Sequence, residues 1–127
     1  MREVKNLKIR DIMIKNPITV STEDTVGHTL NIFEQSQIRP IPILNKEKIA
    51  GVITKEDIYT KRTNRQEKIS DIMLKNPLTV SPDEELIIAL NIIKSTKIPS
   101  IIVAEDTKFV GILTINDIYN KYKHNNR

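Results

Sequence analysis

The residue pattern with the clearest chemical potential in this sequence is Gly-x-x-Thr-x-x-Asp. Its two copies consist of Gly51, Thr54 and Asp57 and of Gly111, Thr114 and Asp117. In both copies an apolar, strand-like stretch precedes the Thr and a helical pattern follows it. The free amides at a helix N-terminus suit a phosphate, and an Asp carboxylate can accept hydrogen bonds from both hydroxyls of a ribose. The pattern therefore describes half of a nucleotide-binding site.

The same spacing also has a purely structural interpretation. A Thr followed three residues later by an acidic residue, at the start of an apolar helix, is a capping box in which the side chains satisfy backbone donors. For one isolated occurrence, the cap is the favoured interpretation. The surrounding sequence is therefore needed to distinguish a nucleotide-binding role from a helix-capping role.

The pattern belongs to a longer internal repeat with an offset of 60 residues and no gap. Residues 8–21 recur as residues 68–81, and both copies contain Asp-Ile-Met and Asn-Pro-x-Thr-Val. Two copies are too few for an open solenoid, so we expect two units packed face to face about an internal pseudo-two-fold axis. The expected boundaries are a first unit at residues 7–61, a linker at 62–67, a second unit at 68–122 and a flexible tail at 123–127.

Each unit is predicted to be an α/β sandwich with the order strand, helix, strand, strand, helix. We expect Ser81 and Glu84 to form a capping box with Pro82 at the first helical position, and Ser21 with Asp24 to give a weaker start signal. The apolar faces of these first helices are predicted to comprise Val26, Leu30 and Phe33 and, in the second copy, Leu86, Leu90 and Ile93. Tyr59 and Tyr119 are expected to pack between helix and sheet.

The composition excludes several classes of protein. The 127 residues include no Cys, which rules out thiolate nucleophiles, Cys-ligated zinc and disulfides. The first residues lack the apolar stretch of a signal peptide, and no apolar run reaches membrane-spanning length, so we expect a soluble cytoplasmic protein. His28 has no second His or acidic cluster at ligand spacing, which favours a surface or packing role over metal binding. Because no catalytic or metal-ligand set is present, we expect no enzyme activity.

The charge pattern bears on nucleic-acid binding. The net charge of +4 comes from 20 basic and 16 acidic residues that are interspersed along most of the chain. Basic residues become denser only near the linker and in the tail, where a solvated linker and a frayed terminus explain them. The aromatic content of 4% also argues against nucleic-acid binding, which we keep as the less favoured alternative.

The ordered set of motifs, repeated at equal spacing with Ile102 in place of the second copy's proline, resembles a CBS-domain pair, or Bateman module. The resemblance covers residues 7–122 and rests on Asp-Ile-Met, Asn-Pro-x-Thr-Val, Ile-Pro-Ile and Gly-x-x-Thr-x-x-Asp. It implies two units joined through their sheets into a disc with two equivalent clefts. Such modules regulate partners by binding adenosine-type ligands, here AMP, ADP, ATP or S-adenosylmethionine, and need no other cofactor. The resemblance also implies a homodimer of stacked discs and a separate effector protein.

The resemblance further implies which residues bind the nucleotide. The ribose contacts fall on Asp57 and Asp117, and Thr54 and Thr114 lie nearest the phosphates. The residues expected against the adenine are Ile18, Leu78, Val52, Ile112, Ile38, Arg39, Ile98 and Pro99. In similar modules each cleft combines an Asp from one unit with adenine contacts from the other. The implied sets are Asp117 with Ile18, Ile38 and Arg39, and Asp57 with Leu78, Ile98 and Pro99.

The two copies differ at positions that should make the clefts unequal. Arg39, Lys55 and Pro42 in the first copy correspond to Pro99, Ile115 and Ile102 in the second. An Arg can form a fork of hydrogen bonds to a phosphate and a Pro cannot donate, so we expect the Asp117 cleft to bind a charged nucleotide better. Lys55 offsets this in the other cleft, and plain surface solvation is the alternative for both cations. A ligand-free assembly module, whose motifs only cap helices, remains the alternative function.

Overall fold

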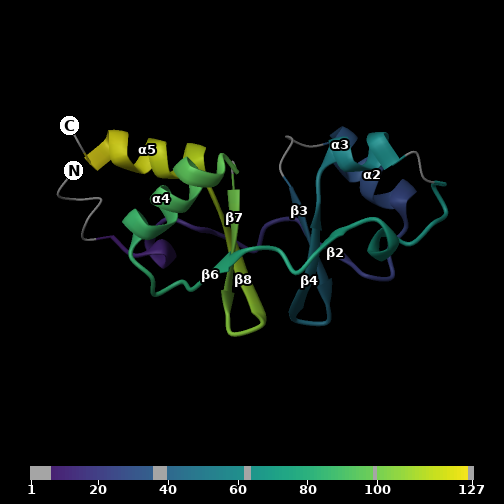
Figure 1. The fold of residues 1–127 in the computed structure, drawn as a ribbon, viewed down its shortest axis with the longest axis horizontal. Helices are drawn as coiled ribbons and strands as arrows, with labels where there is room; N and C mark the ends of the chain where they lie inside the picture. Colours follow the sequence, from purple (N-terminus) through teal and green to yellow (C-terminus); the bar gives the residue numbers. More distant parts are fainter. Residues whose placement is uncertain (1–6, 36–39, 62–63, 99, 126–127) are drawn as a thin grey trace. The chain divides into compact units, whose positions relative to one another are not determined.

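The structure is a computed structural model that describes residues 7–35, 40–61, 64–98 and 100–125, the last four as backbone only. Two compact α/β units are present (Figure 1). The central unit consists of Ile18–Pro77. The terminal unit combines Met1–Pro17 with Leu78–Arg127.

The central unit contains a mixed sheet with two α-helices. Its elements are β2 (Val20–Ser21), α2 (Val26–Gln35), β3 (Ile41–Asn45), β4 (Lys48–Ile53), α3 (Lys55–Lys61), the 3-10 helix η2 (Ile69–Asp71) and β5 (Leu74–Lys75). Strands β2 and β3 are parallel, and β4 pairs antiparallel with both β3 and β5. The predicted order strand, helix, strand, strand, helix is confirmed here, and β5 is an addition to it.

The terminal unit repeats this arrangement. Its elements are the 3-10 helix η1 (Ile9–Asp11), β1 (Ile14–Lys15), β6 (Thr79–Val80), α4 (Leu86–Thr96), β7 (Ser100–Glu105), β8 (Lys108–Thr114) and α5 (Ile115–Asn125). Strands β6 and β7 are parallel, and β8 pairs antiparallel with both β7 and β1. The strand order β6-β7-β8-β1 therefore matches the order β2-β3-β4-β5 of the central unit.

Each unit has its own apolar core, to which the first helix contributes the predicted face. Val26, Leu30 and Phe33 of α2 are buried in the core of the central unit. In α4, Leu86 and Ile93 are buried in the core of the terminal unit, and Leu90 packs against it. The helical spacing of these residues thus correctly predicts which side of each helix faces the sheet.

The first residues of each sequence repeat do not pack with the rest of that repeat. They pack in the compact unit that contains the strands and helices of the other repeat. We call residues 7–15 the N-terminal arm and residues 64–75 the linker arm. Ile9 of the first arm is fully buried in the terminal core, and Ile69 of the second is fully buried in the central core. Burying one Ile side chain contributes about 1.5–3 kcal/mol, so each arm is held by its apolar residue. The sequence repeats and the compact units therefore divide the chain differently.

Backbone hydrogen bonds fix both arms at the same place, just before the first helix of the unit. In the terminal unit the Ile9 amide donates to Glu84 O over 3.0 Å, and the Leu86 amide donates to Leu7 O over 2.9 Å. The linker arm repeats this with Ile69 N to Asp24 O at 2.7 Å and Val26 N to Glu67 O at 2.8 Å. Each arm thus satisfies backbone groups that the turn before the helix would otherwise leave to water.

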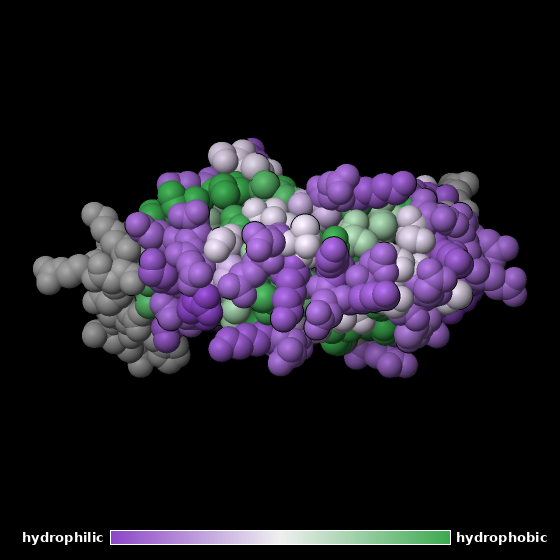
Figure 2. Space-filling view, turned by 90° about the horizontal axis from the view of Figure 1, so that it is seen from below, coloured by the Kyte–Doolittle hydropathy of each residue, from purple (hydrophilic) through white to green (hydrophobic). Residues whose placement is uncertain are grey.

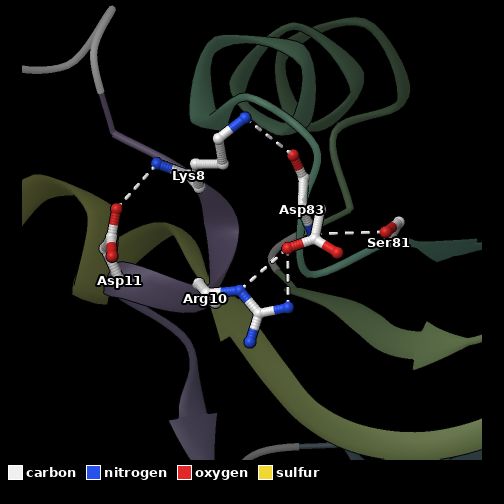
Figure 3. Close-up of polar contacts among 5 residues, drawn as sticks. All are labelled: Lys8, Arg10, Asp11, Ser81 and Asp83. Carbon is white, nitrogen blue, oxygen red and sulfur yellow. Dashed lines mark hydrogen bonds and ion pairs between the residues drawn. The ribbon is translucent and has the colours of Figure 1, made fainter.

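An exposed ion pair orients the N-terminal arm on this turn (Figure 3). Arg10 donates from Nε and Nη2 to Asp83 Oδ1 over 2.9 and 2.6 Å, and Lys8 Nζ donates to Asp83 O over 3.3 Å. The hydrogen bond to Asp83, followed by its negative charge, raises the pKa of Arg10. The Lys8 amide donates to Asp11 Oδ2 over 2.9 Å. Because these groups are exposed, they orient the arm but contribute little to its stability.

The predicted helix starts at Ser81 and Ser21 are wrong. Helix α4 begins at Leu86, and Ser81 Oγ accepts from the Asp83 amide within the preceding turn. The carbonyl of Pro82 accepts from the Arg10 amide over 2.9 Å, so this turn receives the arm instead of starting the helix. In the central unit the cap of α2 is Thr25, whose Oγ1 accepts from the His28 amide over 3.1 Å.

Tyr59 and Tyr119 do not pack between helix and sheet, as the sequence led us to expect. Their side chains are 54% and 64% exposed on α3 and α5. Ile58 and Ile118, the residues just before them, occupy the buried positions instead. The apolar pattern of these helices is narrow, and the aromatic residues fall outside it.

Hydrophilic residues cover most of the molecular face shown in Figure 2, and apolar residues are gathered in smaller areas of that face.

The glycine of each Gly-x-x-Thr-x-x-Asp pattern allows an arm strand to approach closely. Gly111 in β8 lies opposite Lys15 of β1, and Gly51 in β4 lies opposite Lys75 of β5. A Cβ atom at Gly111 would lie 2.7 Å from the Ile14 carbonyl oxygen, and one at Gly51 would lie 2.7 Å from that of Leu74. Neither backbone oxygen can move away without breaking the strand pairing.

We therefore predict that Gly111→Ala lowers the free energy of unfolding by about 1–3 kcal/mol, the usual cost of overpacking. Urea denaturation followed by circular dichroism measures the change. Asn116→Ala, at an exposed position of α5, is the matched control and should unfold like the wild type. Equal stability of the two variants would contradict the close-approach role of the glycine.

Candidate functional site

The Thr-Asp pair of the terminal unit lies where β8 ends and α5 begins, as predicted. Thr114 is the last residue of β8, and α5 starts at Ile115. The Asp117 amide donates to Thr114 Oγ1 over 3.1 Å, and the Thr114 hydroxyl donates to Asp117 Oδ2. Thr114 is only 7% exposed, while Asp117 is half-buried. The carboxylate is therefore held in place at the start of the helix.

The central unit has the equivalent pair at the junction of β4 and α3. Here the Thr54 amide donates to Asp57 Oδ2, and the Asp57 amide donates to Thr54 Oγ1, both over 3.1 Å. These reciprocal bonds form a complete capping box. Both side chains are half-buried.

In both units the Thr and Asp of the pattern thus bond to each other at the start of a helix. This helix-capping role does not prevent the Asp from also binding a ligand. A carboxylate has two oxygens with about four lone-pair sites. The Thr54 amide donates to Oδ2 of Asp57, so the same side chain can cap the helix and accept further hydrogen bonds. A capped Asp is also pre-oriented, which reduces the entropy that a ligand contact would cost.

Apolar residues of the predicted adenine contacts are exposed in both units. Ile18 of the central unit is 53% exposed, and Leu78 and Ile98 of the terminal unit are 51% and 40% exposed. Val52 is half-buried, whereas Ile112 is only 1% exposed and presents almost no open surface. The predicted contacts therefore differ in how accessible they are.

Strand register brings the exposed apolar residues and the Thr-Asp pair to one end of each sheet. In the terminal unit Thr114 pairs with Ser100, the first residue of β7, and the parallel strand β6 begins beside β7 just after Leu78. In the central unit Ile53 pairs with Ile41, the first residue of β3, and β2 begins beside β3 two residues after Ile18. Each unit thus gathers an apolar residue and an anchored carboxylate at the same end of its sheet.

Of the two cations predicted to contact phosphate, Lys55 and Arg39, the structure describes only Lys55. Lys55 is half-buried, and its Nζ lies 5.9 Å from the centroid of the Tyr59 ring, within the range of a cation–π contact. Ile38, Arg39 and Pro99 lie outside the described residues. The expected difference between the clefts that rests on Arg39 and Pro99 therefore stays a prediction.

A shallow depression of about 490 Å³ in the central unit was not predicted. It is lined by residues 19–24, which include β2, and by residues 44–46 at the β3–β4 turn. Its acidic groups already have partners: Asp24 accepts from the Ser21 amide and contacts His28, and Glu23 pairs with Lys68. The hydrogen bond and charge of Glu23 raise the pKa of Lys68. These paired groups leave the depression without an obvious chemical role.

No group of three or more His, Asp or Glu side chains in the part of the chain that the structure describes is arranged to hold a metal ion. His28 contacts Asp24 at 3.1 Å on the surface of α2. None of the helices in the described ranges has the length and apolar character needed to cross a bilayer.

Comparison with known proteins gives concordant matches over both repeats. The family model described as CBS domain matches residues 9–63 and 69–124. Inosine-5'-monophosphate dehydrogenase of Methanocaldococcus jannaschii is 31% identical over 119 residues, which cover 92% of this chain and 24% of the dehydrogenase. The chain therefore spans about a quarter of the length of that relative.

Two solved structures have a similar fold. The CBSX2 structure in complex with AMP has a TM-score of 0.88 at 20% identity and covers 96% of this chain and 100% of its own. The CBS domain pair of protein MJ0100, in complex with 5'-methylthioadenosine and S-adenosyl-L-methionine, has a TM-score of 0.80 at 26% identity. That match covers 94% of this chain and 98% of the other.

The capping role of the Asp predicts a loss of stability that needs no ligand. Asp57→Ala should lower the free energy of unfolding by about 0.5–2 kcal/mol, as expected for a lost helix cap. Urea denaturation without ligand measures it. Glu56→Ala, at the exposed neighbouring position, should stay within about 0.5 kcal/mol of the wild type. If both variants unfold alike, the carboxylate does not cap α3.

Proposed function

This chain belongs to the CBS domain family, and on that premise we propose that it is a regulatory module that binds an adenosine-type ligand and signals its occupancy to a partner protein. The observation that carries the proposal is the shared position of an exposed apolar residue and an anchored Asp. In the terminal unit these are Leu78 and Asp117, and in the central unit they are Ile18 and Asp57. An exposed apolar side chain suits the flat base of a nucleoside, and an anchored carboxylate suits its ribose diol.

The proposed ligands are AMP, ADP, ATP or S-adenosylmethionine. The structural relatives named above were solved with AMP, 5'-methylthioadenosine and S-adenosyl-L-methionine, all of which contain adenosine. In this proposal Asp57 and Asp117 accept hydrogen bonds from ribose hydroxyls, and Thr54 and Thr114 lie towards the 5' substituent. The pairing of each Asp with the adenine contacts of the other repeat stays a prediction.

The proposal assigns no catalysis to this chain. The match to inosine-5'-monophosphate dehydrogenase covers 24% of that enzyme, and the sequence contains no recognisable set of nucleophile, base and acid. We place the module in the cytoplasm, where adenosine ligands are abundant, and propose a separate protein as its effector.

Internal contacts of the cations at the end of α3 and in the linker arm disfavour the nucleic-acid alternative. Lys61 donates to Ile72 O over 2.7 Å, Arg65 donates to Asn31 Oδ1 over 3.0 Å, and Lys68 pairs with Glu23 over 2.9 Å. These described cations are therefore already used inside the central unit. A polyanion would have to replace those contacts, which lowers the gain from counterion release.

We also propose that the module forms homodimers. The exposed residues Tyr59, Ile115 and Tyr119 on α3 and α5 provide apolar surface for such an association. Multi-angle light scattering should give twice the chain mass for the wild type and a monomer for Tyr119→Glu. A monomeric wild type would contradict this part of the proposal.

A thermal-shift panel tests the ligand-binding proposal directly. AMP, ADP, ATP or S-adenosylmethionine at millimolar concentration should raise Tm, since a ligand at 100 times its Kd stabilises by about 2.7 kcal/mol. GTP is the control for the base. A flat profile across the panel would instead support the assembly module.

Asp117→Ala tests the ribose contact, with the Kd for each ligand of the panel measured by isothermal titration calorimetry. Loss of a charge-assisted hydrogen bond costs about 1.5–3 kcal/mol, so calorimetry should show affinity falling about ten- to a hundredfold. Asn116→Ala controls for changes at the start of α5. An unchanged Kd for Asp117→Ala would remove Asp117 from the site.

A further inference from the structure

The chain passes between the terminal and central units twice, and both crossings have the same unusual backbone. The units divide after Pro17 and again after Pro77. The residue before each Pro is an Asn with a positive φ, 53° for Asn16 and 51° for Asn76. Asn enters this left-handed region more easily than most other non-glycine residues, and Pro has a fixed φ and no amide proton. We call each of these pairs an Asn-Pro corner.

The role of the two Asn residues lies in their backbone conformation and not in side-chain contacts. Both are exposed, and no side-chain hydrogen bond joins either of them to another described residue. The other described non-glycine residues with positive φ are Lys46, Lys97 and Asp106, and each lies within one unit, in a hairpin turn or at the end of α4. A residue before Pro is normally extended, so the left-handed backbone of Asn16 and Asn76 is an uncommon conformation at this position.

Each corner lies between an arm strand and a predicted adenine contact. Lys15 of β1 pairs with Gly111, three residues before Thr114, and Ile18 follows only three residues after Lys15. The second corner has the same order, from Lys75 opposite Gly51 to Leu78. A ligand that covers Ile18 or Leu78 therefore acts on the residue next to the Pro of a corner.

We propose that the two Asn-Pro corners transmit ligand occupancy to the arms. Contact of a ligand with Ile18 or Leu78 selects a subset of corner conformations, which strengthens the pairing of β1 with β8 and of β5 with β4. The change then reaches η1 and η2, which are anchored by Ile9 and Ile69. A ligand can favour these states only as far as it binds them better. The inference rests on the proposed function, because the corners need a ligand signal to transmit.

Hydrogen exchange followed by mass spectrometry tests the corners, with AMP and S-adenosylmethionine as separate probes at millimolar concentration. In the wild type, ligand should slow exchange in residues 9–15 and 69–75. Gly accepts the same φ without strain but frees the corner. Asn16→Gly/Asn76→Gly should therefore bind within about fivefold of wild-type affinity and lose at least about half of the slowing. Lys46→Gly, at a positive-φ turn inside the central unit, should respond like the wild type.

The outcomes separate failure of the inference from failure of the proposed function. If the wild type binds neither probe, the proposed function fails and the inference fails with it. If it binds but the arms exchange at unchanged rates, or the double variant keeps the full slowing, the corners do not transmit occupancy and the function stands. Should the double variant not fold, each single variant should lose the slowing in its own arm, residues 9–15 for Asn16→Gly and residues 69–75 for Asn76→Gly.

Discussion

Close backbone approach between each arm strand and a motif glycine is the constraint on which much of this structure depends. At Gly111 and Gly51 a single added methyl group would meet the carbonyl oxygen of the arm strand at 2.7 Å. Without that approach β1 and β5 could not complete their sheets, and Ile9 and Ile69 could not stay buried at the end of the arms.

The same constraint links the arms to the candidate site. Three residues after each glycine the strand ends at a Thr that shares hydrogen bonds with an Asp at the start of the following helix. The three residues of this short segment have different roles. The glycine allows the arm strand to approach, and the hydrogen bonds between Thr and Asp cap the helix and fix the Asp carboxylate. This division explains why the pattern reads equally well as a structural element and as a binding element.

Much of the fold follows from local sequence. The helical spacing of Val26, Leu30 and Phe33 and the alternating strands around residues 41–53 are local signals, and they predict elements that the structure contains. The helix starts were mispredicted because the turns at Ser81 and Ser21 satisfy their backbone groups with a distant arm, which no local pattern reveals. For the same reason the contact between Arg10 and Asp83, 73 residues apart, could not be predicted. The positions of Thr54, Asp57, Thr114 and Asp117 were predictable, whereas the near-complete burial of Ile112 depends on tertiary packing.

The most direct test of the central claim is an NMR titration of isotopically labelled protein with AMP and with S-adenosylmethionine, read at the backbone amides. If the anchored carboxylates form the ligand site, the largest shifts will fall on the amides of Thr54 and Asp57, of Thr114 and Asp117, or of both pairs, together with Ile18 and Leu78. Shifts confined to the depression around residues 19–24 and 44–46, or an unchanged spectrum, would contradict the claim and leave the Thr-Asp pairs as helix caps alone.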